Sequence, residues 1–215
     1  MFRVKICGIT KAPDLEFAGR FGADAAGLNF YPESPRYLGV EKCRNIIGSA
    51  DSALRFVGVF VNEDPDSINR VAEHLGLSCV QLSGDEDEKV ANRVERESIK
   101  VIRAETIDDV RRAEQFPSHW IMFDTPVPGA YGGSGQTFDY EVLVAANIKR
   151  PFLLAGGLTP DNVAAIVKIV RPSGVDVASG VEHSPGVKDP KKMREFIKNA
   201  KEALDFVWPS EEKTP

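Results

Sequence analysis

The sequence predicts a single TIM barrel, the α/β fold in which eight parallel strands alternate with eight helices. The chain has 215 residues, short apolar runs alternate with longer amphipathic runs along its whole length, and no linker interrupts them. Such alternation is typical of βαβ units, and roughly 200–250 residues is an ordinary size for a one-domain barrel. We therefore expect a barrel domain over residues 1–208 and a polar C-terminal tail over residues 209–215.

Eight short runs rich in apolar residues are the predicted strands, and amphipathic stretches that suit helices lie between them. The strands are predicted at Arg3–Cys7, Ala25–Phe30, Arg55–Val61, Cys79–Leu82, Lys100–Arg103, Trp120–Asp124, Phe152–Ala155 and Val175–Ala178. The predicted helices include Pro65–Leu75, Glu86–Glu97, Ile107–Phe116 and Pro160–Val170. An open doubly wound sheet is the alternative, but eight regular units with no natural split favour closure into a barrel.

Three helix starts support this division of the chain. Asp64-Pro65, Thr159-Pro160 and Asp189-Pro190 each place a capping side chain before a proline, whose fixed φ suits the first helical turn. The acidic run Asp85–Glu88 is interpreted as the first turn of another helix, where the helix dipole favours carboxylates.

Composition indicates an ordinary globular protein. The chain carries 27 Lys and Arg against 32 Asp and Glu, a net charge of −5, so it lacks the basic excess of most nucleic-acid-binding proteins. No run reaches the roughly 18 apolar residues that a membrane span needs, and charges interrupt the N-terminus where a secretory signal needs an apolar core. We expect a cytoplasmic protein without nucleic-acid or membrane partners.

The residue types that bind metals are too dispersed to predict a metal site. Cys7, Cys43 and Cys79 form no Cys-x-x-Cys pair, and the three histidines show no His-Glu-x-x-His spacing. An odd, sparse set of cysteines is also unlike a disulfide-stapled secreted domain.

Polar residues gather at the carboxyl ends of the predicted strands, the end of a TIM barrel that carries the active site. Because side chains alternate along a strand, these residues fall into pairs on the same face: Lys5 with Cys7, Gln81 with Ser83, Met122 with Asp124, and Asp176 with Ala178. Buried polar groups are costly unless paired or hydrated, so the pattern predicts a polar cavity at this end.

Two glycine loops predict a phosphate site in that cavity. Ala155-Gly156-Gly157-Leu158 precedes a predicted helix, and Ser179-Gly180 follows the last strand. Glycines let the backbone approach an anion, and the N–H groups at a helix start are suitable donors. The loops after the seventh and eighth strands are the usual phosphate site of this fold, so we expect the N–H groups of Gly157, Ser179 and Gly180 to bind phosphate.

Three side chains are candidates for chemistry. An isolated cysteine is more often a small buried hydrophobe, but Cys7 ends the first strand and should face the cavity. Asp124 ends an apolar strand, where capping a turn is the structural alternative. Arg36 is by default a solvated loop residue, and becomes functional only for a ligand with a carboxylate that its planar guanidinium can hold.

The glycine-dense loop Gly129–Thr137 follows Asp124 closely in the sequence. It is a candidate mobile lid or second anion-binding nest, and it lacks the Gly-Lys-Ser/Thr ending of a nucleotide-binding P-loop.

At this point the sequence resembles the phosphoribosylanthranilate isomerases of tryptophan biosynthesis. The resemblance runs in order through Lys5–Thr10, Phe30–Tyr37, Val57–Asn62, Val80–Leu82, Asp124-Thr125, Gly132–Gly135 with Thr137–Asp139, Ala155–Leu158, Val175–Val177 and Ser179–Glu182, and thus covers essentially the whole chain. The first and last of these segments are the specific ones, since other phosphate-binding barrels share the glycine loops.

The resemblance implies a TIM barrel that performs a cofactor-free Amadori rearrangement of N-(5′-phosphoribosyl)anthranilate. It implies that Cys7 is the general base, Asp124 the general acid and Arg36 the partner of the anthranilate carboxylate. It also implies a substrate-binding set: Arg36, Gly8, Gln81, Gly156, Gly157, Asp176, Ser179 and Gly180. Opening a ribose ring needs an acid, and moving the double bond needs a base, for which a thiolate serves if its pKa is lowered; Lys5 could help to lower it.

The sequence departs from the family pattern at four positions. Ser83 stands where many members have His, Gln136 where many have Lys, Ala178 where many have Ser, and Glu33 where Lys is common. These departures concern substrate affinity rather than proton transfer.

Three alternatives stay open at this stage. The histidine-pathway isomerase performs the same rearrangement on another amine, but an Asp ends its first strand where this chain has Cys7. Indole-glycerol phosphate synthase would need an N-terminal extension and a catalytic Lys that is absent from the matching positions. A non-catalytic phosphate-ligand-binding barrel would not need both Cys7 and Asp124. The sequence leaves the oligomeric state open.

Overall fold

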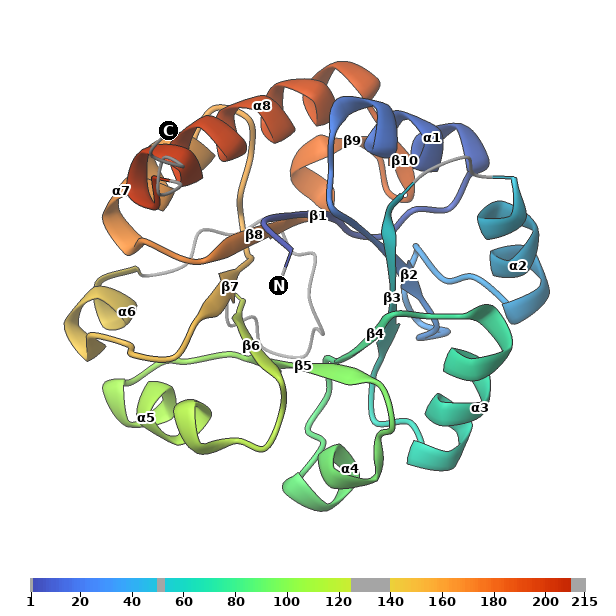
Figure 1. Cartoon of the computed structure of the whole chain (residues 1–215), viewed down its shortest axis with the longest axis horizontal. Helices are drawn as coiled ribbons and strands as arrows, with labels where there is room; N and C mark the ends of the chain where they lie inside the picture. Colours follow the sequence, from blue (N-terminus) through green and yellow to red (C-terminus); the bar gives the residue numbers. More distant parts are fainter. Residues whose placement is uncertain (1, 50–52, 125–139, 210–215) are drawn as a thin grey trace, which may run out of the picture.

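Eight parallel strands close into a barrel in the part of the chain that the structure describes, residues 2–49, 53–124 and 140–209 of this computed structural model (Figure 1). The strands are β1 (Val4–Ile6), β2 (Ala25–Asn29), β3 (Arg55–Phe60), β4 (Cys79–Leu82), β5 (Glu97–Ile102), β6 (Trp120–Phe123), β7 (Phe152–Leu154) and β8 (Gly174–Val177). Each strand pairs with the next, and β8 returns to pair with β1. The predicted TIM barrel is confirmed, and the open sheet is excluded by this closure.

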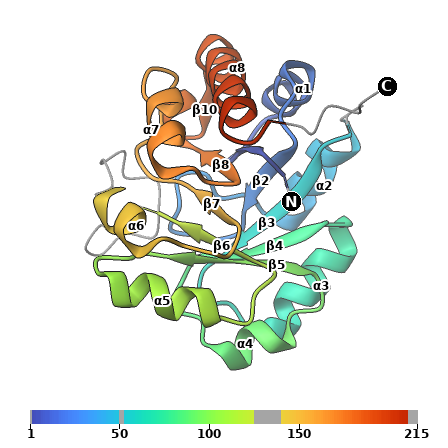
Figure 2. The same ribbon diagram turned by 60° about the vertical axis from the view of Figure 1, so that its left-hand side comes forward.

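The helices surround the barrel and cover its outer face (Figures 1 and 2). They are α1 (Ala12–Phe21), α2 (Val40–Gly48), α3 (Pro65–Leu75), α4 (Glu88–Arg93), α5 (Ile107–Gln115), α6 (Tyr140–Ala146), α7 (Val163–Val170) and α8 (Pro190–Val207). Between β8 and α8 lie the short 3₁₀ helix η1 (Ser179–Val181) and a hairpin of β9 (Glu182–Ser184) and β10 (Val187–Lys188). The predicted tail over residues 209–215 lies, from residue 210 on, outside the described residues.

Two predicted boundaries were wrong around β5. The helix α4 ends at Arg93 instead of continuing to residue 97, because the backbone of Val94 is extended (φ −77°, ψ 126°). Strand β5 begins three residues early, at Glu97, which pairs in register with Cys79 of β4. An ion pair with Arg55 accommodates the Glu97 carboxylate, so this charged residue is stable at a strand start.

Two of the three predicted helix starts are confirmed. The Asp64 carboxylate accepts a hydrogen bond from the Ser67 N–H, and Asp189 caps α8 in the same way. The third is displaced, because α7 begins at Val163, one turn after Thr159. The Thr159 carbonyl accepts from the N–H groups of Asn162 (3.3 Å) and Val163 (3.1 Å), and the Asn162 amide accepts from the Thr159 N–H (2.8 Å) and donates to the Gly157 carbonyl (2.9 Å), so a single hydrogen-bonded turn precedes the regular helix.

Apolar side chains fill most of the barrel interior, and the polar side chains lie at the carboxyl ends of the strands. A cluster inside the barrel consists of Phe2, Ala25, Val57, Cys79, Ile99, Val101, Met122, Leu153 and Ala155. A larger cluster lies between the sheet and the helices. No helix among the described residues is both long enough and apolar enough to cross a membrane.

Candidate active site

A cavity of about 370 Å³ opens at the carboxyl ends of the strands. Nine of the ten site residues predicted from the sequence line it: Cys7, Arg36, Gln81, Asp124, Gly156, Gly157, Asp176, Ser179 and Gly180. The tenth, Gly8, is buried directly after Cys7. The residues predicted from the sequence therefore lie together and make up nine of the 22 residues that line this cavity.

Cys7 follows β1 and lies close to several charged groups. Lys5, two residues earlier on the same face, is fully buried and its Nζ lies 2.8 Å from the Asp176 carboxylate. Gly27 on β2 leaves room for both side chains, since a Cβ there would lie 2.8 Å from the Cys7 sulfur and 3.1 Å from Lys5 Nζ.

The pKa of the Cys7 thiol is raised. Burial is the largest cause and Asp176 adds to it, while the charges of Lys5 and Lys188 lower this pKa without overcoming burial. Lys5 therefore acts on the Cys7 thiol in the expected direction, but burial outweighs it, so the pKa of Cys7 stays above its ordinary value.

Asp124 follows β6 and is half-buried in the cavity wall. Its backbone N–H donates to the Ile102 carbonyl (3.1 Å), which continues the β5–β6 pairing past the end of the strand. Burial, together with the Asp124 carboxylate, raises the pKa of Tyr140 to about 12. Because β6 and β1 are separated by β7 and β8, Asp124 and Cys7 enter the cavity from distant sides of its rim.

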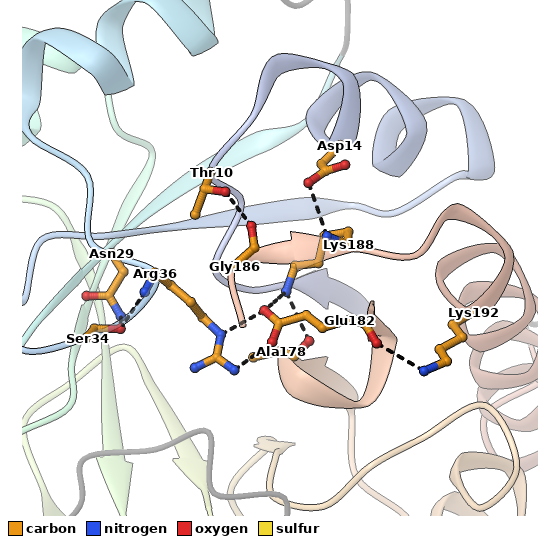
Figure 3. A network of polar contacts seen from close by, with 10 residues as sticks. All are labelled: Thr10, Asp14, Asn29, Ser34, Arg36, Ala178, Glu182, Gly186, Lys188 and Lys192. Carbon is orange, nitrogen blue, oxygen red and sulfur yellow. Dashed lines mark hydrogen bonds and ion pairs between the residues drawn. The ribbon is translucent and has the colours of Figure 1, made fainter. Parts of the chain in front are cut away.

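Arg36 is buried rather than solvated, in contrast to the default interpretation of a loop arginine. Its Nε and Nη2 atoms donate to the two carboxylate oxygens of Glu182, at 2.8 and 2.7 Å (Figure 3). The Arg36 stem lies on Gly8, where a Cβ would approach the Arg36 Cδ to 2.3 Å. Gly8 also has a positive φ of 72°, so glycine suits this position twice.

The two glycine loops meet at the β7–β8 side of the cavity. Gly156 and Gly157 have φ values of 83° and 64°, in the left-handed region that favours glycine. A Cβ on Gly180 would lie 1.9 Å from the Leu158 carbonyl oxygen, so the backbones of the two loops pack directly against each other. Ser179 and Gly180 belong to η1, and the loops together form one wall of the cavity.

The opposite side carries polar side chains from β4 and β5. Gln81 Nε2 donates to Ser83 Oγ (3.0 Å), and Arg103 Nη2 donates to the Ser83 carbonyl (2.8 Å). The Gln81 Oε1 atom is buried and has no hydrogen-bond partner among the described residues. An acceptor of this kind in a cavity wall is suited to a ligand hydroxyl.

Beneath this side a buried ion pair holds the β4–α4 loop. Glu86 lies 2.6 Å from Lys100 Nζ and accepts from the backbone N–H groups of Asn62 and Gly84. The prediction that residues 85–88 form a helical turn was wrong for the first three, since α4 begins at Glu88 with Asp87 as its cap.

Charged residues that sequence reasoning did not name as site residues include Arg103 in the cavity wall and Glu182 and Lys188 in contact with each other near it. Glu182 and Lys188 belong to the hairpin after β8, and the turn residues Pro185-Gly186 signalled that hairpin. Nothing local indicated that its side chains would reach Arg36.

The candidate lid Gly129–Thr137 lies outside the described residues. Among the described residues, no cluster of three or more His, Cys, Asp and Glu side chains has a geometry that could hold a metal ion.

A family model described as N-(5'phosphoribosyl)anthranilate (PRA) isomerase matches residues 4–199. The chain belongs to this family. Its relatives named N-(5'-phosphoribosyl)anthranilate isomerase include one from Geotalea uraniireducens, 46% identical over 94% of this chain and 99% of the relative, and one from Thermotoga neapolitana, 47% identical over the same shares. The family predicted from the sequence is confirmed, and the related barrel enzymes are set aside.

Solved structures agree with this assignment. The phosphoribosyl anthranilate isomerase from Thermotoga maritima superposes with a TM-score of 0.86 at 40% identity, covering 94% of this chain and all of that one. A structure of phosphoribosyl anthranilate isomerase in complex with reduced 1-(o-carboxyphenylamino)-1-deoxyribulose 5-phosphate gives 0.83 at 39% identity, with the same coverage.

Proposed function

We propose that this chain isomerises N-(5′-phosphoribosyl)anthranilate to 1-(2-carboxyphenylamino)-1-deoxyribulose 5-phosphate in tryptophan biosynthesis. The observation that carries the proposal is one cavity that combines a thiol, a carboxylate, a glycine-loop wall and a buried arginine: Cys7, Asp124, residues 156–157 with 179–180, and Arg36. Each is suited to one part of this substrate, which bears a phosphate, a sugar ring and a carboxylate.

The glycine loops are the proposed phosphate site. The backbone N–H groups of Gly157, Ser179 and Gly180 donate to the phosphate oxygens, and the positive φ of Gly156 brings the loop close to the anion. Arg36 holds the anthranilate carboxylate. Binding at both ends stretches the substrate across the barrel mouth and fixes the sugar between the two proton-transfer groups.

Asp124 is the proposed general acid. Its protonated carboxyl group donates a proton to the ribose ring oxygen while the bond from that oxygen to C1 breaks, and the nitrogen lone pair forms a C1–N double bond. The aspartate is left ionised. A carboxyl group that is half-buried at the rim of a cavity can serve this purpose if it is protonated when substrate binds.

Cys7 is the proposed general base. Its thiolate removes the proton on C2, and the electrons of that C–H bond form a C1–C2 double bond while the nitrogen regains its lone pair. The resulting enolamine becomes the ketone when its hydroxyl proton leaves and C1 gains a proton. Lys5 and Lys188 favour the thiolate form, against burial and Asp176.

Gln81 and Asp176 complete the proposed binding set. Gln81 presents its buried Oε1 atom to a sugar hydroxyl. Asp176 accepts from Lys5 through Oδ1, and since Asp176 lines the cavity, we assign its other oxygen, Oδ2, to the substrate. The mechanism needs no cofactor. We also propose a cytoplasmic location, in line with three cysteines that are all free thiols.

The test is a fluorescence assay that follows the loss of N-(5′-phosphoribosyl)anthranilate. The purified chain is expected to consume this substrate and to leave the histidine-pathway phosphosugar unchanged. Binding of the substrate without turnover would instead establish a non-catalytic phosphate-ligand barrel, and turnover of the second substrate alone would exclude the proposed function.

A further inference from the structure

The hairpin after β8 places a buried three-residue charge network beside the proposed carboxylate end of the cavity (Figure 3). Its members, Arg36, Glu182 and Lys188, are 8%, 7% and 3% exposed. The hairpin is tied to the rest of the barrel through its turn, where the Thr10 hydroxyl donates to the Gly186 carbonyl. The network is therefore a built feature of the cavity rim.

Glu182 occupies one edge of the Arg36 guanidinium. The two hydrogen bonds run from Nε and Nη2, and Nη1 lies on the side away from Glu182 (Figure 3). A guanidinium has a second edge, between Nη1 and Nη2, that can also form paired hydrogen bonds with a carboxylate. Since Arg36 lines the cavity, this edge is the one left for a ligand.

By itself, however, the Arg36–Glu182 pair is electrically neutral and would attract an anion only weakly. Lys188 changes that balance. Its side chain is fully buried, and its Nζ donates to Glu182 Oε1 (2.9 Å) and to the Ala178 carbonyl (3.0 Å). With two cations and one carboxylate, the network carries one net positive charge, which matches one substrate carboxylate.

Among the neighbouring charges, a Cys7 thiolate acts on both Arg36 and Lys188 and offsets part of this positive charge, equally for substrates with and without a carboxylate. Lys5 and Asp176 form their own ion pair. Asp14 accepts from the Lys188 backbone N–H (3.2 Å); burial raises the pKa of its carboxyl, and Lys11 acts on it as a nearby opposite charge.

We propose that Lys188 is a specificity-determining residue that selects a substrate with a carboxylate at the Arg36 end of the cavity, without itself contacting that carboxylate. Glu182 orients Arg36, and the Lys188 ammonium cancels the charge of Glu182 so that Arg36 keeps its attraction for an anion. This inference rests on the proposed function, because it assigns the substrate carboxylate to Arg36.

The test compares two substrates: N-(5′-phosphoribosyl)anthranilate and N-(5′-phosphoribosyl)aniline, which lacks the carboxylate. The quantity measured is the ratio of their kcat/KM values. Effects of a variant on Cys7, on Asp124 or on phosphate binding change both values alike and cancel in the ratio. Wild-type protein that acts on neither substrate would contradict the proposed function itself, not this inference alone.

Lys188→Met is expected to lower this ratio by about 10- to 100-fold, the scale of one charge lost from a partly dry site. Its matched control is Lys192→Met, since Lys192 Nζ donates to the Glu182 backbone carbonyl (3.0 Å) but stands on an exposed position of α8. The control should keep the wild-type ratio. An unchanged ratio in Lys188→Met, or an equal fall in Lys192→Met, would overturn the proposal.

Two further measurements keep the test decisive if Lys188→Met folds poorly. The double variant Glu182→Gln/Lys188→Met restores one net positive charge. Its ratio should therefore exceed that of Lys188→Met, and should lie near the wild-type ratio if only the double variant folds.

The second measurement is the pH dependence of the ratio in the wild type, which should fall as the pH rises. Burial lowers the pKa of Lys188 and Arg36 lowers it slightly, while Glu182 and Cys7 raise it without overcoming burial. Titration of Cys7 does not change the ratio, because the enzyme needs the Cys7 thiolate to act on either substrate. A ratio that stays constant up to pH 10.5, the ordinary lysine pKa, would overturn the proposal, and so would a double variant with a strongly reduced ratio.

Discussion

The Lys5 ammonium lies 2.8 Å from the Asp176 carboxylate inside the barrel, across the neighbouring strands β1 and β8. The two residues are in register, so the pairing follows directly from how the barrel closes. Burial opposes the charge of Lys5, but Asp176 and Cys7 outweigh burial and raise its pKa above the ordinary lysine value. Lys5 therefore stays protonated, and its positive charge acts on both the Asp176 carboxylate and the Cys7 sulfur.

This relationship predicts the effect of Asp176→Asn on the Cys7 thiol. The substitution removes a negative charge that raises the pKa of Cys7 and releases Lys5 to act on the sulfur, so the pKa of Cys7 should fall. The rate of alkylation by iodoacetamide between pH 6 and 10 measures this shift. Cys43 and Cys79 provide internal controls, because burial raises the pKa of each to about 12. A Cys7 alkylation profile that moves to higher pH would contradict the electrostatic account.

Cys7 and Asp124 are expected to be indispensable for turnover and dispensable for folding. Cys7→Ala and Asp124→Asn should each lower kcat by about 10²–10⁴-fold, the usual scale for the loss of one proton-transfer group. Product binding should survive in both, because neither side chain belongs to the phosphate wall. Steady-state kinetics and product titration check this. Near-normal turnover in Cys7→Ala would return this cysteine to a structural role.

Gly8→Ala should damage the carboxylate end of the site through Arg36. The new methyl group would lie 2.3 Å from the Arg36 Cδ, so the guanidinium must shift, and we expect KM to rise by roughly 10- to 100-fold. The matched control is Gly76→Ala, where φ is also positive (61°) but nothing lies within 4 Å of the added atom. The control should cost only about 1–2 kcal/mol of unfolding free energy, with KM unchanged. Equal KM values for the two variants would exclude steric control of Arg36 by Gly8.

Much of the fold followed from the sequence because local signals agreed with tertiary packing. The strand β4 and the helix α3 have the predicted ends. The cap Asp64 before Pro65 marks the start of α3, and Gly76 marks its end. Signals failed where a distant partner decided the structure. Glu97 looks unsuitable for a strand until Arg55 is placed beside it, and the regular helix after Thr159 begins only at Val163, because the Asn162 side chain bonds back to Thr159 and Gly157.

The cavity wall was predictable because every TIM barrel places its strand ends together, whereas its electrostatics were not. Inward parity grouped Lys5 with Cys7, yet it did not reveal that Asp176 would take the Lys5 charge and that burial would raise the pKa of Cys7. In the same way, Arg36 and Glu182 are 146 residues apart, and only the folded hairpin brings them into contact.

Gly180→Ala should weaken phosphate binding by separating the two glycine loops. A Cβ at residue 180 would lie 1.9 Å from the Leu158 carbonyl oxygen, a backbone atom that cannot move aside as a side chain would. We expect KM to rise and competitive inhibition by inorganic phosphate to weaken, each by about 10-fold or more. Gly39→Ala is the control, since nothing lies within 4 Å of its added atom. Unaltered phosphate inhibition in Gly180→Ala would place the phosphate elsewhere.

Glu182 should make the stability of the protein depend on acid pH. Burial raises the pKa of this carboxyl, but the hydrogen bonds and charges of Arg36 and Lys188 prevail and hold the pKa below its ordinary value of 4.5. The unfolded chain therefore takes up the proton first, so the stabilisation is present above about pH 4.5 and is lost as the pH falls through the lower, folded-state pKa.

At pH 7, Glu182→Gln should cost about 3–5 kcal/mol of unfolding free energy, because it leaves two buried cations without their carboxylate. Urea unfolding of wild type and variant from pH 7 to pH 3 should show this difference shrinking as the pH falls. Glu202→Gln, at an exposed pair with Lys198, should stay within about 0.5 kcal/mol of wild type at pH 7. A difference between wild type and Glu182→Gln that is constant over the whole pH range would show that Glu182 titrates alike in the folded and unfolded chains.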